Sequence, residues 1–379
     1  MRIKLFNGRF LDGRGEQGDC LYLENGLIAK EGPADEVIDC RGLVVMPAFI
    51  DMHTHLRDPG WPEKETIETG MRAALHGGYG TLCAMANTNP VCATPELVEE
   101  NHRIAKELNL CHLIQSGAAG EELNDEIPTD RAALSKVTKV LTNDGKTIFS
   151  DSFMEQLMVD SEEYGFIIST HSQPERQIVA RDIELLKKVG GNLHVGHISH
   201  RETAAMIREA KKQGLPITCE VTPHHLFGWD CDYRVNPPLR SRADVEALIQ
   251  GCKDGTVDCL STDHAPHTPE AKAAGMAGIS NIDYALSVYW KVFSENGLTL
   301  QDLTRMGAMR PAQLLGLPQG LLEIGRPADL MAFDPEEIWN IREEDLFSRS
   351  HNTPFLGREV KGRVHWTMIG GEMRYEYHG

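Results

Sequence analysis

The chain has 379 residues, 41% hydrophobic and 25% charged, so it can bury a large core and exceeds one typical domain. Its formal net charge of -18 argues against nucleic acid or an anionic membrane as a partner. The chain has nine cysteines but no CxxC pair, which predicts free thiols. Its N-terminus lacks the apolar core of a signal peptide, so together these features predict a cytoplasmic protein.

The two ends of the chain share one style. Residues 1–46 contain short strand-like pieces broken by glycine, such as KLFNGRFL and CLYLENGLIAKEG. Similar pieces return from about residue 320, in GLLEIGRPADLMAFDP and KGRVHWTMIGGEMRYEY. The simplest arrangement is one β-rich subdomain built from residues 1–46 and 320–379, beside a larger domain of residues 47–319.

Between these ends, short apolar strands alternate with longer helical stretches. The helical stretches include residues 64–77, 94–108, 152–165, 176–190 and 201–214, and in several of them charged residues flank apolar positions at spacings of three and four. Eight strand-helix units of this kind are typical of a (β/α)8 barrel of roughly 250 residues. The candidate strands are residues 43–55, 79–88, 111–117, 136–144, 166–172, 192–199, 216–225 and 257–266.

The first barrel strand ends in a pattern that indicates metal binding. His53 and His55 are two positions apart, so on a strand both point to the same face. Two imidazoles on one face make half of a metal site, although two histidines that merely pack or face solvent give the same pattern. Arg57 follows at once, and its guanidinium can bind a carboxylate through two hydrogen bonds.

Other strands end in residues of the same chemistry. In a barrel the C-terminal strand ends line one face, where active sites lie. Four imidazoles and two carboxylates there are enough for two metal ions that share a carboxylate, and mixed nitrogen and oxygen ligands suit zinc or another divalent first-row ion. The additional candidate ligands are Asp144, His171, His197 and Asp263.

Each candidate has an ordinary alternative. Asp144 precedes a glycine and could be only a turn residue, His171 could be a packed or capping histidine, and Asp263 could be a helix N-cap. His197 competes with two neighbours, each three positions away and so on the opposite face of a regular strand, and with the pair in TPHH. These competitors are His194, His200, His224 and His225.

The order of these residues resembles the amidohydrolase superfamily, and within it the dihydroorotases of the long bacterial type. HTHLRDPG, EKETIETG, the NTNP turn at residues 87–90, VNPPLR, STDHAPH and NTPFLG all look like dihydroorotase motifs, and they run from residue 53 to residue 357. The combination of HTHLRDPG with STDHAPH is specific, whereas HxH alone is weak.

The resemblance implies a role for each matching residue. His53, His55 and Asp263 would hold one metal, and His171 and His197 the second. Asp144 would bridge the two ions, where related enzymes use a carboxylated lysine; Lys139 is the competitor on the same strand. Two zinc ions are the expected cofactor. The substrate would be bound through Arg57, Asn87, Asn236 and His267, with Asp263 also as the catalytic acid and base.

The implied reaction is the reversible interconversion of N-carbamoyl-L-aspartate and L-dihydroorotate in pyrimidine synthesis. A homodimer and association with aspartate transcarbamoylase come with the resemblance as further expectations. Two alternatives stay open: another cyclic amidase, such as a dihydropyrimidinase, hydantoinase or allantoinase, and a non-catalytic dihydroorotase-like scaffold.

Several positions depart from the family pattern. Pro47-Ala48 replaces the usual Pro-Gly, Ala86 replaces a proline, and TNDG replaces TDDG. The segment after the eighth strand, residues 274–286, lacks the expected glycine and glutamate pattern. These departures leave the predicted metal ligands intact but put the substrate loops in doubt.

Overall fold

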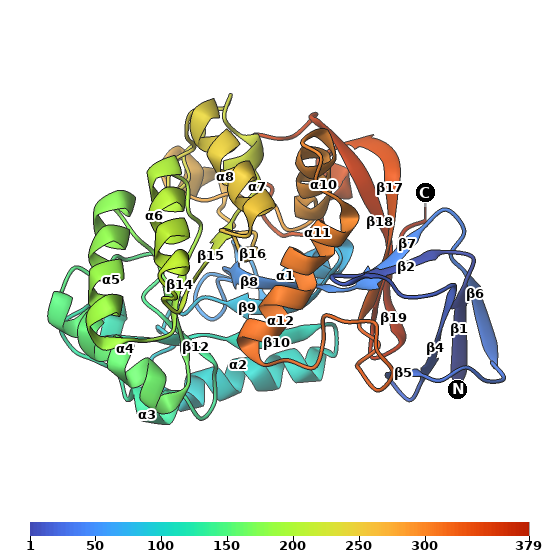
Figure 1. Ribbon diagram of the computed structural model, residues 1–379, viewed down its shortest axis with the longest axis horizontal. Coiled ribbons are helices and arrows are strands. Elements are labelled where there is room, and N and C mark those ends of the chain that lie inside the picture. The colour runs from blue at the N-terminus through green and yellow to red at the C-terminus, as the bar shows by residue number, and fades with distance from the viewer. Residues whose placement is uncertain (379) are drawn as a thin grey trace.

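The computed structural model describes residues 1–378, and its larger part is a parallel barrel (Figure 1). Each barrel strand pairs in parallel with the next, except that Ser116 interrupts the third strand, and the bridge between Thr54 and His264 closes the ring. The expected (β/α)8 fold is therefore confirmed. The barrel strands are β8 (Phe49–Thr54), β9 (Tyr79–Ala84), β10 (His112–Gln115) with β11 (Gly117–Ala118), β12 (Val140–Thr142), β13 (Ile167–Thr170), β14 (Leu193–Val195), β15 (Ile217–Val221) and β16 (Cys259–Leu260).

Amphipathic helices cover the barrel. In α6 (Arg201–Lys212) the buried side chains recur at helical spacing, which places one apolar face on the strands. Thr66 forms a capping box at the start of α1 (Ile67–His76), and Ser150 caps α4 (Asp151–Tyr164). The other helices are α2 (Pro95–Leu108), α3 (Arg131–Leu134), α5 (Glu175–Val189), α7 (Pro223–Phe227), α8 (Arg242–Asp254), α9 (Pro269–Ala273), α10 (Ala285–Glu295), α11 (Leu300–Thr304) and α12 (Arg310–Leu315). Two short 3-10 helices, η1 (Glu121–Leu123) and η3 (Glu343–Asp345), and one π-helical segment, η2 (Arg305–Met309), complete the set.

Both ends of the chain contribute strands to a β-rich region beside the barrel (Figure 1, blue and red). One sheet has the order β5-β4-β1-β6, and the other has the order β19-β18-β17-β7-β2-β3. The domain limits at residues 46/47 and 319/320 stay a prediction. The strands are β1 (Arg2–Phe6), β2 (Arg9–Asp12), β3 (Gly15–Glu16), β4 (Cys20–Glu24), β5 (Leu27–Ala29), β6 (Glu36–Asp39), β7 (Val44–Pro47), β17 (Leu330–Asn340), β18 (Glu359–Ile369) and β19 (Glu372–Glu376).

The apolar run of residues 43–55 is two strands, not the one expected. Val44–Pro47 pairs with β17 and β2, whereas Phe49–Thr54 enters the barrel. The change falls at Ala48, because its N–H donates to Asp329 while the N–H of Phe49 donates to Gly78 of the neighbouring barrel unit. This short connection ties the position of the first barrel strand to the terminal sheet.

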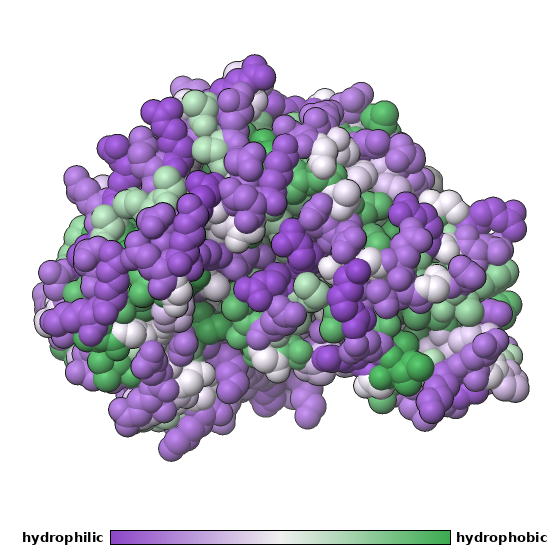
Figure 2. Space-filling model, in the orientation of Figure 1, coloured by the Kyte–Doolittle hydropathy of each residue, from purple (hydrophilic) through white to green (hydrophobic). Residues whose placement is uncertain are grey.

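The face of the molecule in Figure 2 is mostly polar, and the cysteines are unpaired. Figure 2 shows a mostly hydrophilic face with small, scattered hydrophobic areas. Across residues 1–378, no helix is both long and apolar enough to cross a membrane. All nine cysteines are free thiols.

Candidate metal centre and substrate cleft

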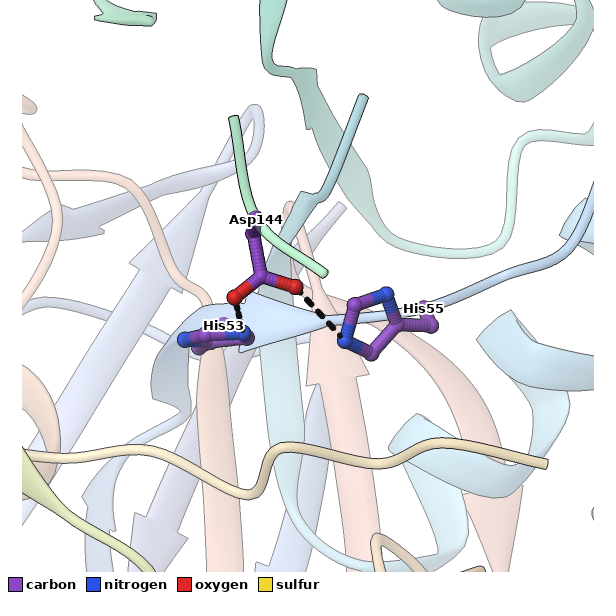
Figure 3. Close-up of side chains that lie close together, drawn as sticks. All are labelled: His53, His55 and Asp144. Atoms are coloured by element: carbon purple, nitrogen blue, oxygen red, sulfur yellow. Dashed lines mark ion pairs between the residues drawn. The ribbon is translucent and has the colours of Figure 1, made fainter. Parts of the chain in front are cut away.

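The predicted ligands from the strand ends meet at one point. His53 lies on β8 and Asp144 follows β12, and Figure 3 shows the carboxylate of Asp144 pointing between the two histidine rings. Each of its oxygens approaches one imidazole: Oδ1 lies 3.3 Å from His53 Nε2, and Oδ2 lies 3.3 Å from His55 Nε2. All three side chains are buried.

Asp144 also belongs to a second group of ligands. Its Oδ1 lies 3.4 Å from His171 Nδ1 and 3.5 Å from His197 Nε2. His171 follows β13 and His197 follows β14, so four strand ends contribute to the two groups. Two clusters with metal-ligand spacing therefore share one carboxylate. Such sharing is the arrangement that a carboxylate bridging two metal ions requires.

The donor atoms have the spacing of metal ligands. Ligands about 2.05 Å from a tetrahedral zinc lie about 3.3 Å from one another. The distances from Asp144 to the four histidines, 3.3 to 3.5 Å, match this value. His53 Nε2 and Asp144 Oδ1 are also buried without a hydrogen-bond partner, and buried polar atoms are rarely left so. The residues present fit a divalent metal ion.

Asp263 borders the first group of ligands. Its Oδ1 lies 3.2 Å from His55 Nε2 and 3.7 Å from His53 Nε2. Burial alone would raise the pKa of Asp263, but the hydrogen bond with His55 and the charge of His53 outweigh burial and lower it below the ordinary range. The carboxyl group is therefore held ionised, in the form that can bind a cation.

Glu220 on β15 supports the centre from inside the barrel. Its Oε1 lies 2.7 Å from His53 Nδ1, and its Oε2 accepts from Ser261 and lies 3.1 Å from His194 Nε2. A carboxylate at one nitrogen of an imidazole holds the other nitrogen free for a metal. Burial opposes the charged form of His53, but Asp144 and Glu220 together raise its pKa. Glu220 is not among the site residues predicted from the sequence, although an acidic residue within the apolar run ITCEV was the available signal.

Three site residues have unusual backbone conformations. Arg57, His197 and Asp263 have positive φ angles of 58°, 32° and 45°. Such angles strain residues other than glycine, and strain of this kind is concentrated at functional sites, where surrounding contacts hold it. The backbone is thus bent so that these side chains face the same space.

The four predicted substrate residues line the cleft above the ligands. The cleft has a volume of about 360 Å³ and is lined by His55, Arg57, Asn87, Asp144, His171, His197, Asn236, Asp263 and His267, among others. Asn87 also accepts from His55 Nδ1 through its Oδ1, at 2.8 Å. Asn236 Nδ2 lies 2.9 Å from His171 Nε2. Both amides therefore contact candidate metal ligands as well as the cleft.

Arg57 lies in the cleft without a carboxylate. It makes no ion pair with any acidic side chain of residues 1–378, and its Nε donates to Pro266 O at 3.2 Å. Burial lowers its pKa to about 10, which still leaves it charged at neutral pH. His267 lies 3.3 Å away and is neutral, because burial and the charge of Arg57 lower its pKa to about 3. An uncompensated, partly buried guanidinium favours binding of an anion.

The competing ligands lie elsewhere. Lys139 is exposed and precedes β12, at the strand end away from Asp144. His194 contacts Thr218 and Glu220, and His225 contacts Thr222 and the carbonyl of Pro237, so both rings have other partners. The other competitors are His200, which is only half-buried near Glu202 and Asp244, and His224, whose Nδ1 lies 3.2 Å from Asn281 Nδ2. The assigned roles of all site residues stay predictions.

Comparison with known proteins gives a consistent answer. A model of the amidohydrolase family matches residues 44–374. Dihydroorotase of Caldanaerobacter subterraneus subsp. tengcongensis is 36% identical, covering 99% of this chain and 98% of that protein. Dihydroorotase of Clostridium botulinum is also 36% identical, covering 99% of this chain and all (100%) of that protein. An L-hydantoinase structure from Arthrobacter aurescens superposes with a TM-score of 0.89 at 21% identity, covering 99% and 96% of the two chains, which shows the shared fold alone.

Proposed function

The chain belongs to the amidohydrolase family and groups with its dihydroorotases, and on that premise we propose how its cleft interconverts L-dihydroorotate and N-carbamoyl-L-aspartate. One observation carries the proposal. A single cleft is lined both by the two groups of candidate metal ligands and by the guanidinium of Arg57, which pairs with no acidic side chain of residues 1–378. The substrate needs both: an amide to be broken or formed, and a carboxylate to be held beside it.

Arg57 supplies the carboxylate receptor in this proposal. A bidentate, charge-assisted pair with the α-carboxylate fixes the ring relative to the ligand groups, and positioning of this kind contributes to the rate. Asn87 can offer its amide N–H groups to the substrate, because its oxygen is engaged by His55. Uncharged cyclic amides such as dihydrouracil and hydantoin would leave Arg57 without a partner, which disfavours them.

The family is metal-dependent, and we propose two zinc ions at this centre. His53, His55 and Asp263 would bind one ion, and His171 and His197 would bind the other. Asp144 would bind both ions. A divalent metal supplies Lewis acidity toward the amide carbonyl and makes water a nucleophile at neutral pH. The buried, unpartnered nitrogen of His53 and oxygen of Asp144 support this assignment.

Asp263 carries the proton in both directions. In hydrolysis its carboxylate takes a proton from the attacking water and delivers it to the leaving ring nitrogen. In cyclisation it takes the proton from that nitrogen as the ring closes and returns it to the departing oxygen. The hydrogen bond with His55 keeps the carboxylate ionised between turnovers.

Location and partners complete the proposal. Nine free cysteines support a cytoplasmic location. A homodimer and association with aspartate transcarbamoylase are part of the same proposal. Sedimentation of the purified chain, alone and mixed with that enzyme, tests both.

The test is turnover and metal content measured on the same sample. We expect turnover of dihydroorotate and carbamoyl aspartate, bound divalent metal, and loss of activity on chelation that zinc restores. Preference for hydantoin, dihydrouracil or allantoin would instead assign another cyclic amidase. A protein without bound metal and without turnover of any of them would be a scaffold.

A further inference from the structure

Lys272 occupies an unusual position at the edge of the cleft. It lies in the short helix α9, and its ammonium group donates to three backbone carbonyls, those of Arg234, Met276 and Gly278, each at 2.9 Å. A lysine ammonium has three donors, so these bonds use all of them. Across residues 1–378 it makes no ion pair with a carboxylate.

The three carbonyls belong to two different segments of the cleft wall. Arg234 comes two residues before Asn236, whose amide reaches His171. Met276 and Gly278 flank Ala277, whose carbonyl lies 2.9 Å from His267 Nε2. The ammonium of Lys272 thereby connects the loop that carries Asn236 with the wall that supports His267.

The two segments are also linked directly, and little space remains around Gly278. Gly278 N also donates to Arg234 O, at 3.2 Å. Gly278 has a φ of 144°, and a Cβ there would lie 2.6 Å from Ala265 O and 2.8 Å from His267 Cδ2. The ring of Tyr233 lies 4.2 Å from the Lys272 ammonium, which adds a cation–π contact from the first segment.

We propose that Lys272 is a positioning residue for the substrate, which sets the distance between Asn236 and His267 across the mouth of the cleft. It touches neither the metal ligands nor the reacting atoms in this role. Its effect therefore falls on substrate binding more than on the chemical step. This inference rests on the proposed function, because it concerns the same substrate.

The test compares Lys272→Met with Lys272→Arg and with the control Lys253→Met. Methionine keeps the side chain as far as its fourth atom but removes the ammonium and every donor, and arginine keeps the charge in a different geometry. Lys253 is an exposed lysine of α8 and is not among the residues that line the cleft. We expect Lys272→Met to raise KM for dihydroorotate about tenfold with kcat within about threefold of the native value, Lys272→Arg to recover part of the loss, and Lys253→Met to change neither.

Hydrogen exchange supplies a readout that does not depend on turnover. In Lys272→Met we expect faster amide exchange in both residues 229–240 and residues 265–280, with exchange in the barrel strands unchanged. If Lys272→Met folds poorly, Lys272→Gln keeps two donors and serves in its place. An unchanged KM, an equal loss of kcat, or faster exchange in only one segment overturns the proposal. If the native protein does not turn over dihydroorotate, the proposed function is overturned instead. The exchange measurement then still tests whether Lys272 connects the two loops.

Discussion

The floor of the cleft lies within the barrel, whereas its rim is formed by loops outside it. The floor consists of the six candidate ligands, which are all buried and lie in or just after barrel strands. Carboxylates hold them from below: Glu220 at His53, and Asp51, which accepts from the backbone of His53 and from Thr262. Buried carboxylates whose oxygens are held by hydrogen bonds keep the ligands in a fixed geometry, which metal binding requires.

The rim is held by neutral backbone groups instead. Asn352, from the C-terminal segment, accepts from His267 N at 2.9 Å and from Ser280 Oγ at 2.6 Å, and donates to Gly278 O at 3.1 Å. Lys272 makes a similar set of bonds from the other side. Changes in the floor should therefore affect metal binding and the chemical step, whereas changes in the rim should affect substrate affinity.

The largest effect is expected at Asp263. Replacement Asp263→Asn keeps the shape but removes the proton acceptor, so we expect kcat to fall by about 10³-fold or more while the thermal unfolding temperature changes little. Asp19→Asn, at an exposed aspartate, is the matched control and should leave kcat unchanged. Near-native turnover in Asp263→Asn would contradict the acid–base role.

Replacing Glu220, which supports the floor from inside the barrel, should lower the affinity for metal. Glu220→Gln keeps the contact with His53 but loses the negative charge, so we expect metal affinity to fall about 10- to 100-fold. Titration with a competing chelator measures this, with Glu246→Gln on the exposed face of α8 as control. Native metal affinity together with reduced activity would show that Glu220 acts in some other way.

At the boundary between floor and rim, Arg57 should control substrate affinity. Arg57→Met removes the charged donors, and the lost bonds to the carboxylate are worth about 1.5–3 kcal/mol each, so KM for dihydroorotate should rise about tenfold or more. Metal content, measured on the same sample, should not change. A fall in kcat with KM unchanged would remove the carboxylate assignment.

The smallest effect is expected from the rim alone. Asn352→Ala removes the side-chain bonds to His267 and Gly278 but no charge, so we expect KM to rise about threefold and metal affinity to stay native. Kinetics and metal titration on one preparation check this. Loss of bound metal in Asn352→Ala would mean that floor and rim are not separate in the way described.

Local sequence patterns predicted most of the floor. Side chains on a strand alternate in direction, and the C-terminal ends of parallel barrel strands share one face, so local patterns were enough to select His53, His55, Asp144, His171 and Asp263 as neighbours. The helices covering the barrel were equally accessible, because their apolar spacing is also a local property.

Only the tertiary structure decided which competing residues meet. Glu220 reaches His53 across 167 positions, and the exposure of Lys139 follows from where β12 begins in the ring. The same holds for the contact of Lys272 with the carbonyl of Arg234, 38 positions away, and for that of Asn352 with the amide of His267, 85 positions away. A local sequence pattern specifies the direction of a side chain, but its partner depends on barrel closure and loop packing, which are set by contacts along the whole chain.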